Sequence, residues 1–224
     1  MDIIDFTAVF NIADNQNNDK YFLAPKWPFR LLILGPSGCG KTNLLFNLIA
    51  KYRTWDKLII YSRHLEQPLY RAFIEEMYLD QNQEEISFNS DIDDILNPDY
   101  LDKEKQNLYV FDDFMTSRDQ NGIVDVFIRG RHANCSCIYL TQCYFPVNRT
   151  IRLNCNYFAI FNIASKRELV ELQKDHATDV GKDDFLKLYR EAVAEPYSFF
   201  VIDKCTDLLP LKYRRRFAGL NKNG

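Results

Sequence analysis

Residues 31–47, LLILGPSGCGKTNLLFN, decide how the rest of the chain is interpreted. The run opens with four apolar residues, which is typical of a buried strand, and apolar residues return at helical spacing after residue 41. Glycine-rich sequence separates the two halves. An ordinary glycine turn between a strand and a helix would explain this pattern, but a more specific motif lies in the same place.

The glycine-rich segment fits the pattern G-x-x-x-x-G-K-[ST]. In loops of this kind, backbone N–H groups surround the phosphates of a nucleotide, the lysine reaches the β- and γ-phosphates, and the hydroxyl group binds Mg²⁺. We therefore expect a nucleoside triphosphate here, with Lys41 on its phosphates and Thr42 on the metal. The predicted nucleotide-binding residues are Gly35, Pro36, Ser37, Gly38, Cys39, Gly40, Lys41, Thr42 and Asn43.

Two carboxylates follow a second apolar run, NLYVFDD, at residues 107–113. In P-loop NTPases, an acidic residue at the carboxyl end of a buried strand holds Mg²⁺, and a second carboxylate can orient and deprotonate the attacking water. Asp112 fits the first role and Asp113 the second. Alone, such a pair would equally fit a strand that runs into a solvated turn; together with the upstream loop it predicts hydrolysis.

A third apolar run, SCIYLTQ at residues 136–142, ends on Gln142. Parallel strands bring their carboxyl ends to one crevice, so we expect Gln142 to face the γ-phosphate and to sense or orient the attacking water. The alternative is a glutamine that only caps the strand exit. A helix expected within residues 119–131 ends in Arg129 and Arg131, which would normally complement the helix dipole and face water.

Further apolar segments alternate with helical patterns along the chain. Strands are expected within residues 57–63, 156–163 and 197–203, and helices within residues 68–78, 167–174 and 183–194. The alternation predicts an α/β protein: a P-loop NTPase three-layer fold of the additional-strand class, with a central mostly parallel sheet of five or more strands. The acidic residues 80–102 are expected to form a solvated insertion, with a short helix at residues 91–96.

The two ends of the chain are more polar than its middle. We expect a flexible N-terminal arm at residues 1–20, an ATPase domain at residues 21–210 and a basic C-terminal tail at residues 211–224. The aromatic segment 21–30 either folds back over a nucleotide base or packs at an edge of the fold. The basic cluster KYRRR, residues 212–216, is either a phosphate-binding patch or a solvated tail.

Composition narrows the class of protein further. The chain has 224 residues, 46% hydrophobic composition, a net charge of −3 and a pI near 5.7, which excludes a globally basic nucleic-acid-coating protein. It contains neither an apolar run of membrane-spanning length nor a signal-peptide pattern, so a soluble intracellular protein without membrane contact is expected. Its six cysteines form no C-x-x-C pair, which argues against a zinc site.

In order along the chain, the segments GPSGCGKTNLL, YVFDDF and FIRGRHANCSCIYLTQCYFPVNRTIRLNCNYF resemble the viral genome-packaging ATPases of the FtsK–HerA superfamily, found in poxviruses, other large DNA viruses, virophages and polinton-like elements. The similarity covers about residues 27–163. It implies a homo-oligomeric ring that hydrolyses ATP with Mg²⁺ and drives double-stranded DNA into a preformed capsid, with a capsid or portal-like component as partner. Host cytoplasm or nucleus, at sites of virion assembly, is the implied location.

The resemblance also assigns roles. Lys41 and Thr42 become Walker A residues, Asp112 and Asp113 the Walker B pair, and Gln142 the polar end of the sensor strand. Such ATPases use an arginine finger from a neighbouring subunit, for which Arg129 and Arg131 are the candidates; a guanidinium there stabilises charge on the γ-phosphoryl group. Asp113 departs from many relatives in the wider ATPase group, which carry glutamate.

Two other functions fit the phosphate loop. One is a small-molecule phosphotransferase resembling a nucleoside kinase, in which Arg149 and Arg152 would be the lid arginines. The other is a nucleotide-gated binding or scaffold protein with little turnover. A decayed site is less consistent with the intact set Lys41, Thr42, Asp112 and Asp113.

Overall fold

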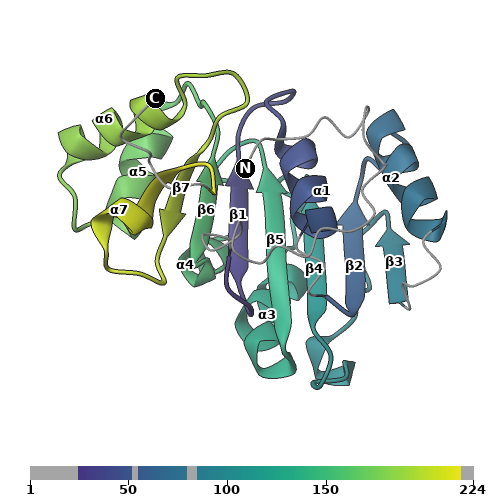
Figure 1. Ribbon diagram of the computed structural model, residues 1–224. Coiled ribbons are helices and arrows are strands. Elements are labelled where there is room, and N and C mark those ends of the chain that lie inside the picture. Colours follow the sequence, from purple (N-terminus) through teal and green to yellow (C-terminus); the bar gives the residue numbers. More distant parts are fainter. Residues whose placement is uncertain (1–24, 52–54, 80–84, 218–224) are drawn as a thin grey trace.

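The computed structural model describes residues 25–51, 55–79 and 85–217 (Figure 1). Within them the chain forms one eight-stranded sheet in the order β3-β2-β4-β5-β1-β6-β7-β8. The strands are β1 Arg30–Leu34, β2 Lys57–Ser62, β3 Glu85–Asn89, β4 Asn107–Asp112, β5 Cys135–Thr141, β6 Tyr157–Ile160, β7 Phe200–Asp203 and β8 Tyr213–Arg215. The expected α/β fold is confirmed.

Helices fill most of the connections between strands. They are α1 Lys41–Lys51, α2 Pro68–Leu79, α3 Asn121–Arg129, α4 Arg149–Asn154, α5 Lys166–His176, α6 Lys182–Ala192 and α7 Leu209–Lys212, with 3-10 turns η2 Pro98–Tyr100 and η3 Gly130–Ala133. None of the described helices has the length and apolar character needed to cross a bilayer. The expected helices within residues 68–78, 167–174 and 183–194 are thus present, each with slightly different ends.

The strands from β3 to β6 pair in parallel, and β7 and β8 add to them in antiparallel fashion. Parallel strands are covered by helices on both faces, which is why β1, β4 and β5 appear in the sequence as continuous apolar runs. The sheet is therefore mostly parallel, as expected. All parallel strands end at the same edge, and residues that follow them are brought together there.

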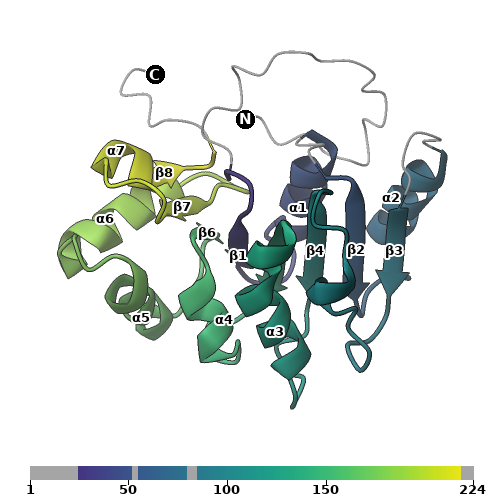
Figure 2. The same ribbon diagram turned by 90° about the horizontal axis from the view of Figure 1, so that it is seen from below.

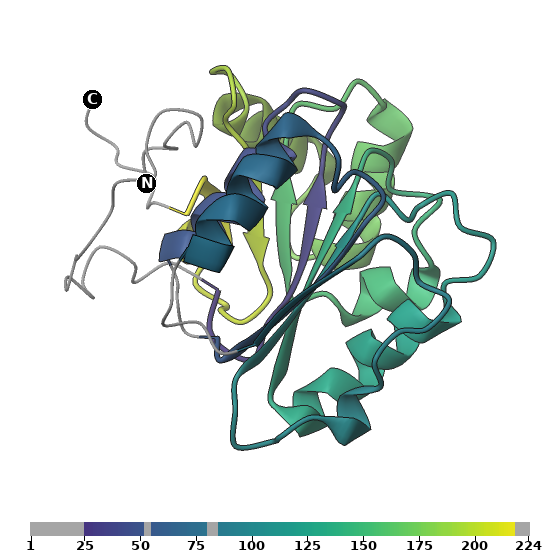
Figure 3. The ribbon, with the colours of Figure 1, turned by 90° about the vertical axis from the view of Figure 1, so that its right-hand side faces the viewer.

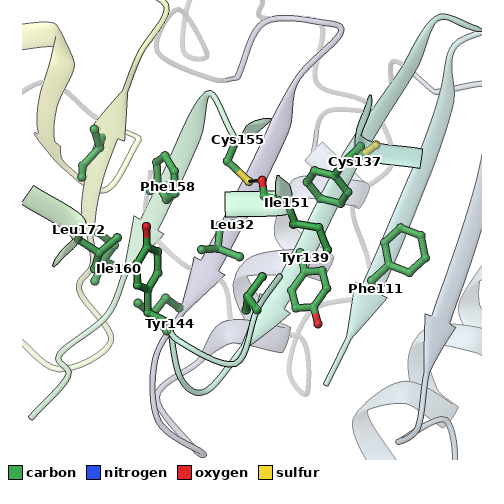
Figure 4. Close-up of a cluster of buried hydrophobic side chains, with 14 of the residues drawn as sticks. Leu32, Phe111, Cys137, Tyr139, Tyr144, Ile151, Cys155, Phe158, Ile160 and Leu172 are labelled. Atoms are coloured by element: carbon green, nitrogen blue, oxygen red, sulfur yellow. Dashed lines mark hydrogen bonds between the residues drawn. The ribbon is translucent and has the colours of Figure 1, made fainter. Parts of the chain in front are cut away.

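Two layers of helices enclose the sheet. Figures 2 and 3 show α1 and α2 on one face and α3 and α4 on the other. Side chains of alternating strand positions split accordingly into two buried clusters, one of which also contains residues of α5 and α6. That cluster includes Leu32, Tyr139, Phe158 and Leu172 (Figure 4). The two cores hold the strands rigidly, so side chains at the strand ends have fixed positions.

The acidic insertion is more ordered than the sequence suggests. Its residues 85–89 form β3, an edge strand that pairs in parallel with β2, and Lys57 lies 2.8 Å from Glu85 across that pair. The expected helix at residues 91–96 is wrong. Residues 93–94 form a turn, and the 3-10 turn η2 follows it, where the Asn97 side chain accepts a hydrogen bond from the N–H of Asp99. Pro98 disfavours helical backbone at the residue before it.

The basic cluster at residues 212–216 is not a solvated tail. Residues 213–215 are strand β8, and the Arg214 side chain is only 1% exposed, with its guanidinium 3.1 Å from Asp203 of β7. The strand expected within residues 197–203 is β7, which begins at Phe200. Short, basic and adjacent to an antiparallel neighbour, β8 has no periodic apolar pattern that would reveal it in the sequence.

The aromatic residues before β1 lie far from the carboxyl ends of the strands. The indole N–H of Trp27 donates to Asn134 at 2.8 Å, and the backbone N–H of Asn107, the first residue of β4, donates to the carbonyl of Asn134 at 3.1 Å. For residues 25–30, the hypothesis of a cover over the nucleotide base is therefore wrong, and packing at an edge is correct. Residues 1–24, with the predicted arm, lie outside the described residues.

Arg214 should be a major stabilising residue. Arg214→Met leaves the buried Asp203 carboxylate without its cation, and we expect the free energy of unfolding in urea to fall by about 3–5 kcal/mol. Arg190→Met, on the exposed face of α6, is the matched control and should change it by less than about 0.5 kcal/mol. Adding Asp203→Asn to Arg214→Met should recover part of the loss. No recovery would contradict the ion-pair explanation.

One buried histidine gives the fold a defined pH dependence. His176 ends α5, lies against Phe158 with ring centroids 4.1 Å apart, and has Nε2 2.8 Å from the Tyr144 hydroxyl. Burial, together with the nearby Lys204 and Arg152 charges, lowers the pKa of His176 to about 3, and the Asp175 carboxylate opposes this shift. The folded state therefore holds this imidazole neutral at pH values where the unfolded chain protonates it.

The pH dependence follows from this difference. Since the unfolded state binds more protons below pH 6.5, stability is fully present above that pH and falls as pH decreases toward the folded pKa. This group alone should lower the free energy of unfolding by about 2 kcal/mol between pH 7.5 and pH 5. Urea denaturation should show a much smaller decrease over this pH range in His176→Gln than in the native chain, with a substitution of an exposed histidine, His132→Gln, as the matched control.

Candidate nucleotide-binding site

The predicted phosphate loop connects the end of β1 to the start of α1. Two glycines have positive φ angles, 76° at Gly38 and 102° at Gly40, which L side chains rarely adopt. At Gly35 the constraint is space, because a Cβ atom would lie 2.6 Å from both Phe161 Cβ and Cys39 Sγ. The loop therefore needs glycine at Gly38 and Gly40 because of their backbone angles and at Gly35 because of the space around it, before any ligand is considered.

The lysine of the motif is held across the loop. Lys41 Nζ donates to the carbonyl of Gly35 at 2.7 Å and to that of Pro36 at 2.9 Å. Lys41 is also the first residue of α1, so its ammonium group and the free N–H groups of the helix start face the same space. Helix N-termini of this kind favour anions, and phosphate above all.

A cavity of about 730 Å³ opens over the loop. Its lining includes Ser37, Gly38, Gly40, Lys41, Thr42 and Asn43 of the loop. The ends of β4 and β5 add a second wall with Asp112, Asp113 and Gln142, and a third wall contains Tyr197 and Arg216. The structure thus brings together the loop, both predicted carboxylates and the predicted glutamine.

Asp112 is the last residue of β4 and is almost completely buried. The Tyr70 hydroxyl of α2 donates to its Oδ2 at 2.6 Å. Burial raises the pKa of Asp112, while the hydrogen bond from Tyr70 and the charges of His64 and Lys41 oppose that shift. A carboxylate in such a position has few partners of its own and gains from a nearby cation.

Asp113 follows with a strained backbone and both oxygens engaged. Its φ is 64°, uncommon for a residue with a side chain, and such strain is concentrated at functional sites. His64 Nε2 lies 2.7 Å from Oδ2, and the Gln142 amide donates to Oδ1 at 3.5 Å. The carboxylate is therefore held in one orientation between two polar side chains.

Sequence reasoning missed the contribution of β2. Directly after this strand, Arg63 donates to the hydroxyls of Thr116 and Ser117, at 3.1 and 2.8 Å, and His64 contacts Asp113. Both side chains therefore contact residues that follow the carboxyl end of β4. The signal was available, because residues that follow neighbouring parallel strands meet at one edge, but the sequence does not show that β2 and β4 are neighbours.

Comparison with known proteins identifies the family. The family model described as "Poxvirus A32 protein" matches residues 18–205. The chain belongs to the poxvirus A32 protein family. The resemblance seen in the sequence to viral packaging ATPases is thereby confirmed.

Curated relatives of this A32-family chain are DNA packaging proteins of poxviruses. The variola virus protein OPG160 is 30% identical over 158 residues, covering 65% of this chain and 58% of the relative. The monkeypox virus protein is 30% identical over 166 residues, covering 69% and 55%. The A32-family chain described here thus spans somewhat more than half the length of these relatives.

Solved structures show the same fold. The DNA-packaging ATPase B204 of Sulfolobus turreted icosahedral virus matches with a TM-score of 0.59 and 15% identity, over 84% of this chain and 96% of B204. A structure of B204 from Sulfolobus turreted icosahedral virus 2 with AMP matches with a TM-score of 0.55 and 14% identity, over 79% and 93%. At these identities the likeness shows that this A32-family chain and B204 share a fold.

The two candidate finger arginines lie at the other edge of the sheet. Arg129 ends α3 and pairs with Asp99 at 3.3 Å, and the exposed Arg131 donates to His132 at 3.1 Å. Both precede β5, whose first residue, Cys135, is paired with the first residue of β4. The A32-family chain therefore does not bring Arg129 or Arg131 to its own phosphate loop.

The lid arginines of the phosphotransferase alternative are not placed as a lid. Arg152 of α4 is buried, lies 4.3 Å from the centre of the Tyr144 ring and 3.8 Å from Asp175. These contacts hold α4 against α5 in the core. Neither Arg149 nor Arg152 lines the cavity over the phosphate loop.

The close contacts around Gly35 predict that a side chain at this position destabilises this A32-family protein. Gly35→Ala should lower the free energy of unfolding by about 1–3 kcal/mol, because a methyl group there overlaps Phe161 and Cys39. Gly181→Ala, where the nearest atom is 3.6 Å away, is the control and should change it by less than about 1 kcal/mol. Adding Cys39→Ala to Gly35→Ala should not restore stability, because the Cβ of Phe161 still lies 2.6 Å from the added methyl group.

Proposed function

We propose that this chain is the ATP-hydrolysing core of a homo-oligomeric ring motor that moves double-stranded DNA into a preformed capsid. The observation that carries the proposal is the arrangement of Lys41, Asp113 and Gln142 around one cavity. Membership of the A32 family and the packaging role named for its poxvirus relatives support the DNA substrate. A capsid or portal-like component at sites of virion assembly in the host is the proposed partner.

The proposed binding of ATP follows from the loop. Its N–H groups and Lys41 would surround the β- and γ-phosphates in place of the carbonyl bonds that Lys41 now makes. Structures of B204 have been solved in complex with AMPPCP and with ATP-gammaS, which supports a nucleoside triphosphate as the ligand of this fold. For this chain, ATP is the proposed nucleotide.

Mg²⁺ fits the residues present. Thr42 and Asp112 line the same cavity and offer the hard oxygen ligands that Mg²⁺ prefers. The described residues contain no cluster of three acidic, histidine or cysteine side chains able to hold a metal alone, and Mg²⁺ bound to a nucleotide needs only one or two protein ligands. When bound, the ion would neutralise charge on the phosphates.

Asp113 is the proposed general base. Its Oδ1 and Oδ2 already have hydrogen-bond partners. One of these oxygens would accept a hydrogen bond from the attacking water, while His64 or Gln142 keeps the other oxygen in place. Gln142 reaches Oδ1 from the end of β5, and in this proposal it would orient that water. Aspartate is shorter than glutamate, and Asp113, which has a positive φ, lines the cavity directly.

Arg129 and Arg131 remain the proposed fingers, acting on a neighbouring subunit. Their position at the edge opposite the phosphate loop supports an action in trans, because a neighbour packed head to tail would place that edge beside this cavity. A guanidinium that enters the cavity would stabilise charge on the γ-phosphoryl oxygens.

The proposal predicts ATP hydrolysis that rises with double-stranded DNA and with protein concentration. Lys41→Ala and Asp113→Asn should each reduce the DNA-stimulated rate by about a hundredfold or more, because charge stabilisation and base catalysis are lost. Asparagine tolerates the positive φ of Asp113, so folding should be preserved. Asp91→Asn, an exposed carboxylate outside the site, is the matched control. A fully active monomer indifferent to DNA would contradict the motor.

Mixing experiments test the trans-acting arginine. Arg129→Ala or Arg131→Ala subunits keep an intact phosphate loop, and Lys41→Ala subunits keep both arginines. If one arginine acts in trans, its mutant should regain hydrolysis when mixed with Lys41→Ala, whereas either variant alone stays inactive. Nucleotide binding without turnover in the native chain would favour the switch, and phosphate transfer to nucleosides would favour the phosphotransferase.

A further inference from the structure

The third wall of the cavity carries an aromatic side chain that the proposed chemistry does not use. Tyr197 is 62% exposed and lines the cavity beside Pro196. A Cβ atom on Gly40 would lie 3.4 Å from the Tyr197 ring, so the ring stands next to the phosphate loop. An exposed aromatic ring at this point offers a flat apolar surface to a ligand in the cavity.

The backbone at Tyr197 shows that the side chain is held there at a cost. The N–H of Ser198 donates to the carbonyl of Glu195 at 3.1 Å, which closes a turn with Pro196 second and Tyr197 third. The φ of Tyr197 is 58°. Glycine or asparagine is favoured at the third position of a turn with this conformation, so tyrosine adopts it with strain. Strain of this kind indicates a function for the side chain.

Strand order places Tyr197 on the side of the loop opposite the hydrolytic groups. Asp113 and Gln142 follow β4 and β5, on one side of β1, whereas Tyr197 precedes β7 and Arg216 follows β8, on the other side. A triphosphate with its γ-phosphate near Asp113 therefore runs past Gly40 toward Tyr197. Its α-phosphate and its base would then face the third wall.

Arg216 completes that wall. Its backbone N–H donates to the carbonyl of Phe199 at 2.9 Å, which fixes it beside the turn that carries Tyr197. Its side chain lines the cavity, and its Nε is buried without a hydrogen-bond partner among the described residues. A guanidinium with an unused donor at this point is suited to an anionic oxygen.

We propose that Tyr197 stacks on the base of a purine nucleoside triphosphate and that Arg216 binds the phosphate nearest the ribose. The proposal deepens the proposed ATP site and rests on it. No base-reading hydrogen bond is involved, so ATP and GTP should bind with similar affinity and the larger purines better than pyrimidines. The basic cluster at residues 212–216 thus contributes one phosphate ligand, to the nucleotide rather than to DNA.

Calorimetric titration with ATP and with inorganic tripolyphosphate separates the base from the phosphates. Tyr197→Asn preserves the turn, because asparagine tolerates its φ, and should weaken ATP binding by roughly 5- to 100-fold while leaving tripolyphosphate binding within about twofold. Tyr197→Phe should bind ATP like the native chain. Arg216→Ala should weaken both ligands. Tyr100→Ala, an aromatic residue 82% exposed on η2, is the matched control and should change neither.

A second measurement needs no variant. The fluorescence of 2-aminopurine riboside triphosphate should be quenched when it binds the native chain, since stacking on an aromatic ring quenches this base. The stacking proposal would be overturned if Tyr197→Asn bound ATP like the native chain, or if this variant lost equal affinity for ATP and tripolyphosphate. Binding of the fluorescent nucleotide to the native chain without quenching would overturn it as well. Absence of ATP binding by the native chain would instead overturn the proposed function, so the two failures are distinguishable.

Discussion

A close backbone contact at Gly35 is the constraint on which the rest of the structure depends. Its N–H donates to the carbonyl of Thr141 at 3.1 Å, and the carbonyl of Leu34 accepts from the N–H of Phe161 at 2.8 Å. The start of the phosphate loop is thereby tied to β5 on one side and to β6 on the other. A side chain at Gly35 would occupy the space of Phe161, so the tie exists only because glycine stands there.

This tie fixes the loop relative to the strands that carry the acidic and amide groups. β4 pairs with β5 so that Asp112 lies opposite Leu140, and the next residues along each strand reach the edge together. Asp113 and Gln142 consequently meet at 3.5 Å. Because the strands are clamped between two buried clusters, these distances are set by the sheet and not by flexible loops. The proposed hydrolytic groups are therefore preorganised.

The sequence predicted the centre of the fold well and its margins poorly. Central strands such as β4 are buried on both faces and give continuous apolar runs, which single out Asp112 and Asp113 by their position at the end of a run. Edge strands β3 and β8 are short and rich in polar residues, so their pairing comes from neighbours and not from a local pattern.

The residues of the candidate site also divide into those that a local sequence pattern reveals and those that depend on neighbouring strands. Lys41 and Thr42 belong to a contiguous motif, which physical chemistry requires to be contiguous because one loop must surround the phosphates. His64, Tyr197 and Arg216 reach the cavity from other strands, and their relevance depends on strand order. A sequence without strand order cannot place a histidine after β2 beside a carboxylate after β4. The missing information was thus topological, not chemical.

The length of the strands is the reason why the proposed arginine finger would have to come from a second copy of the chain. A strand of six or seven residues spans about 20 Å, and this distance separates the edge with Asp113 from the edge with Arg129 and Arg131. One chain cannot bring these arginines onto its own phosphates. Head-to-tail contacts join unlike edges, and repeated contacts of that type close into a ring when the rotation permits. In the proposed ring, Arg129 would have to leave Asp99 before entering the next cavity, so seating of the neighbour, release of that ion pair and hydrolysis would be linked in one step.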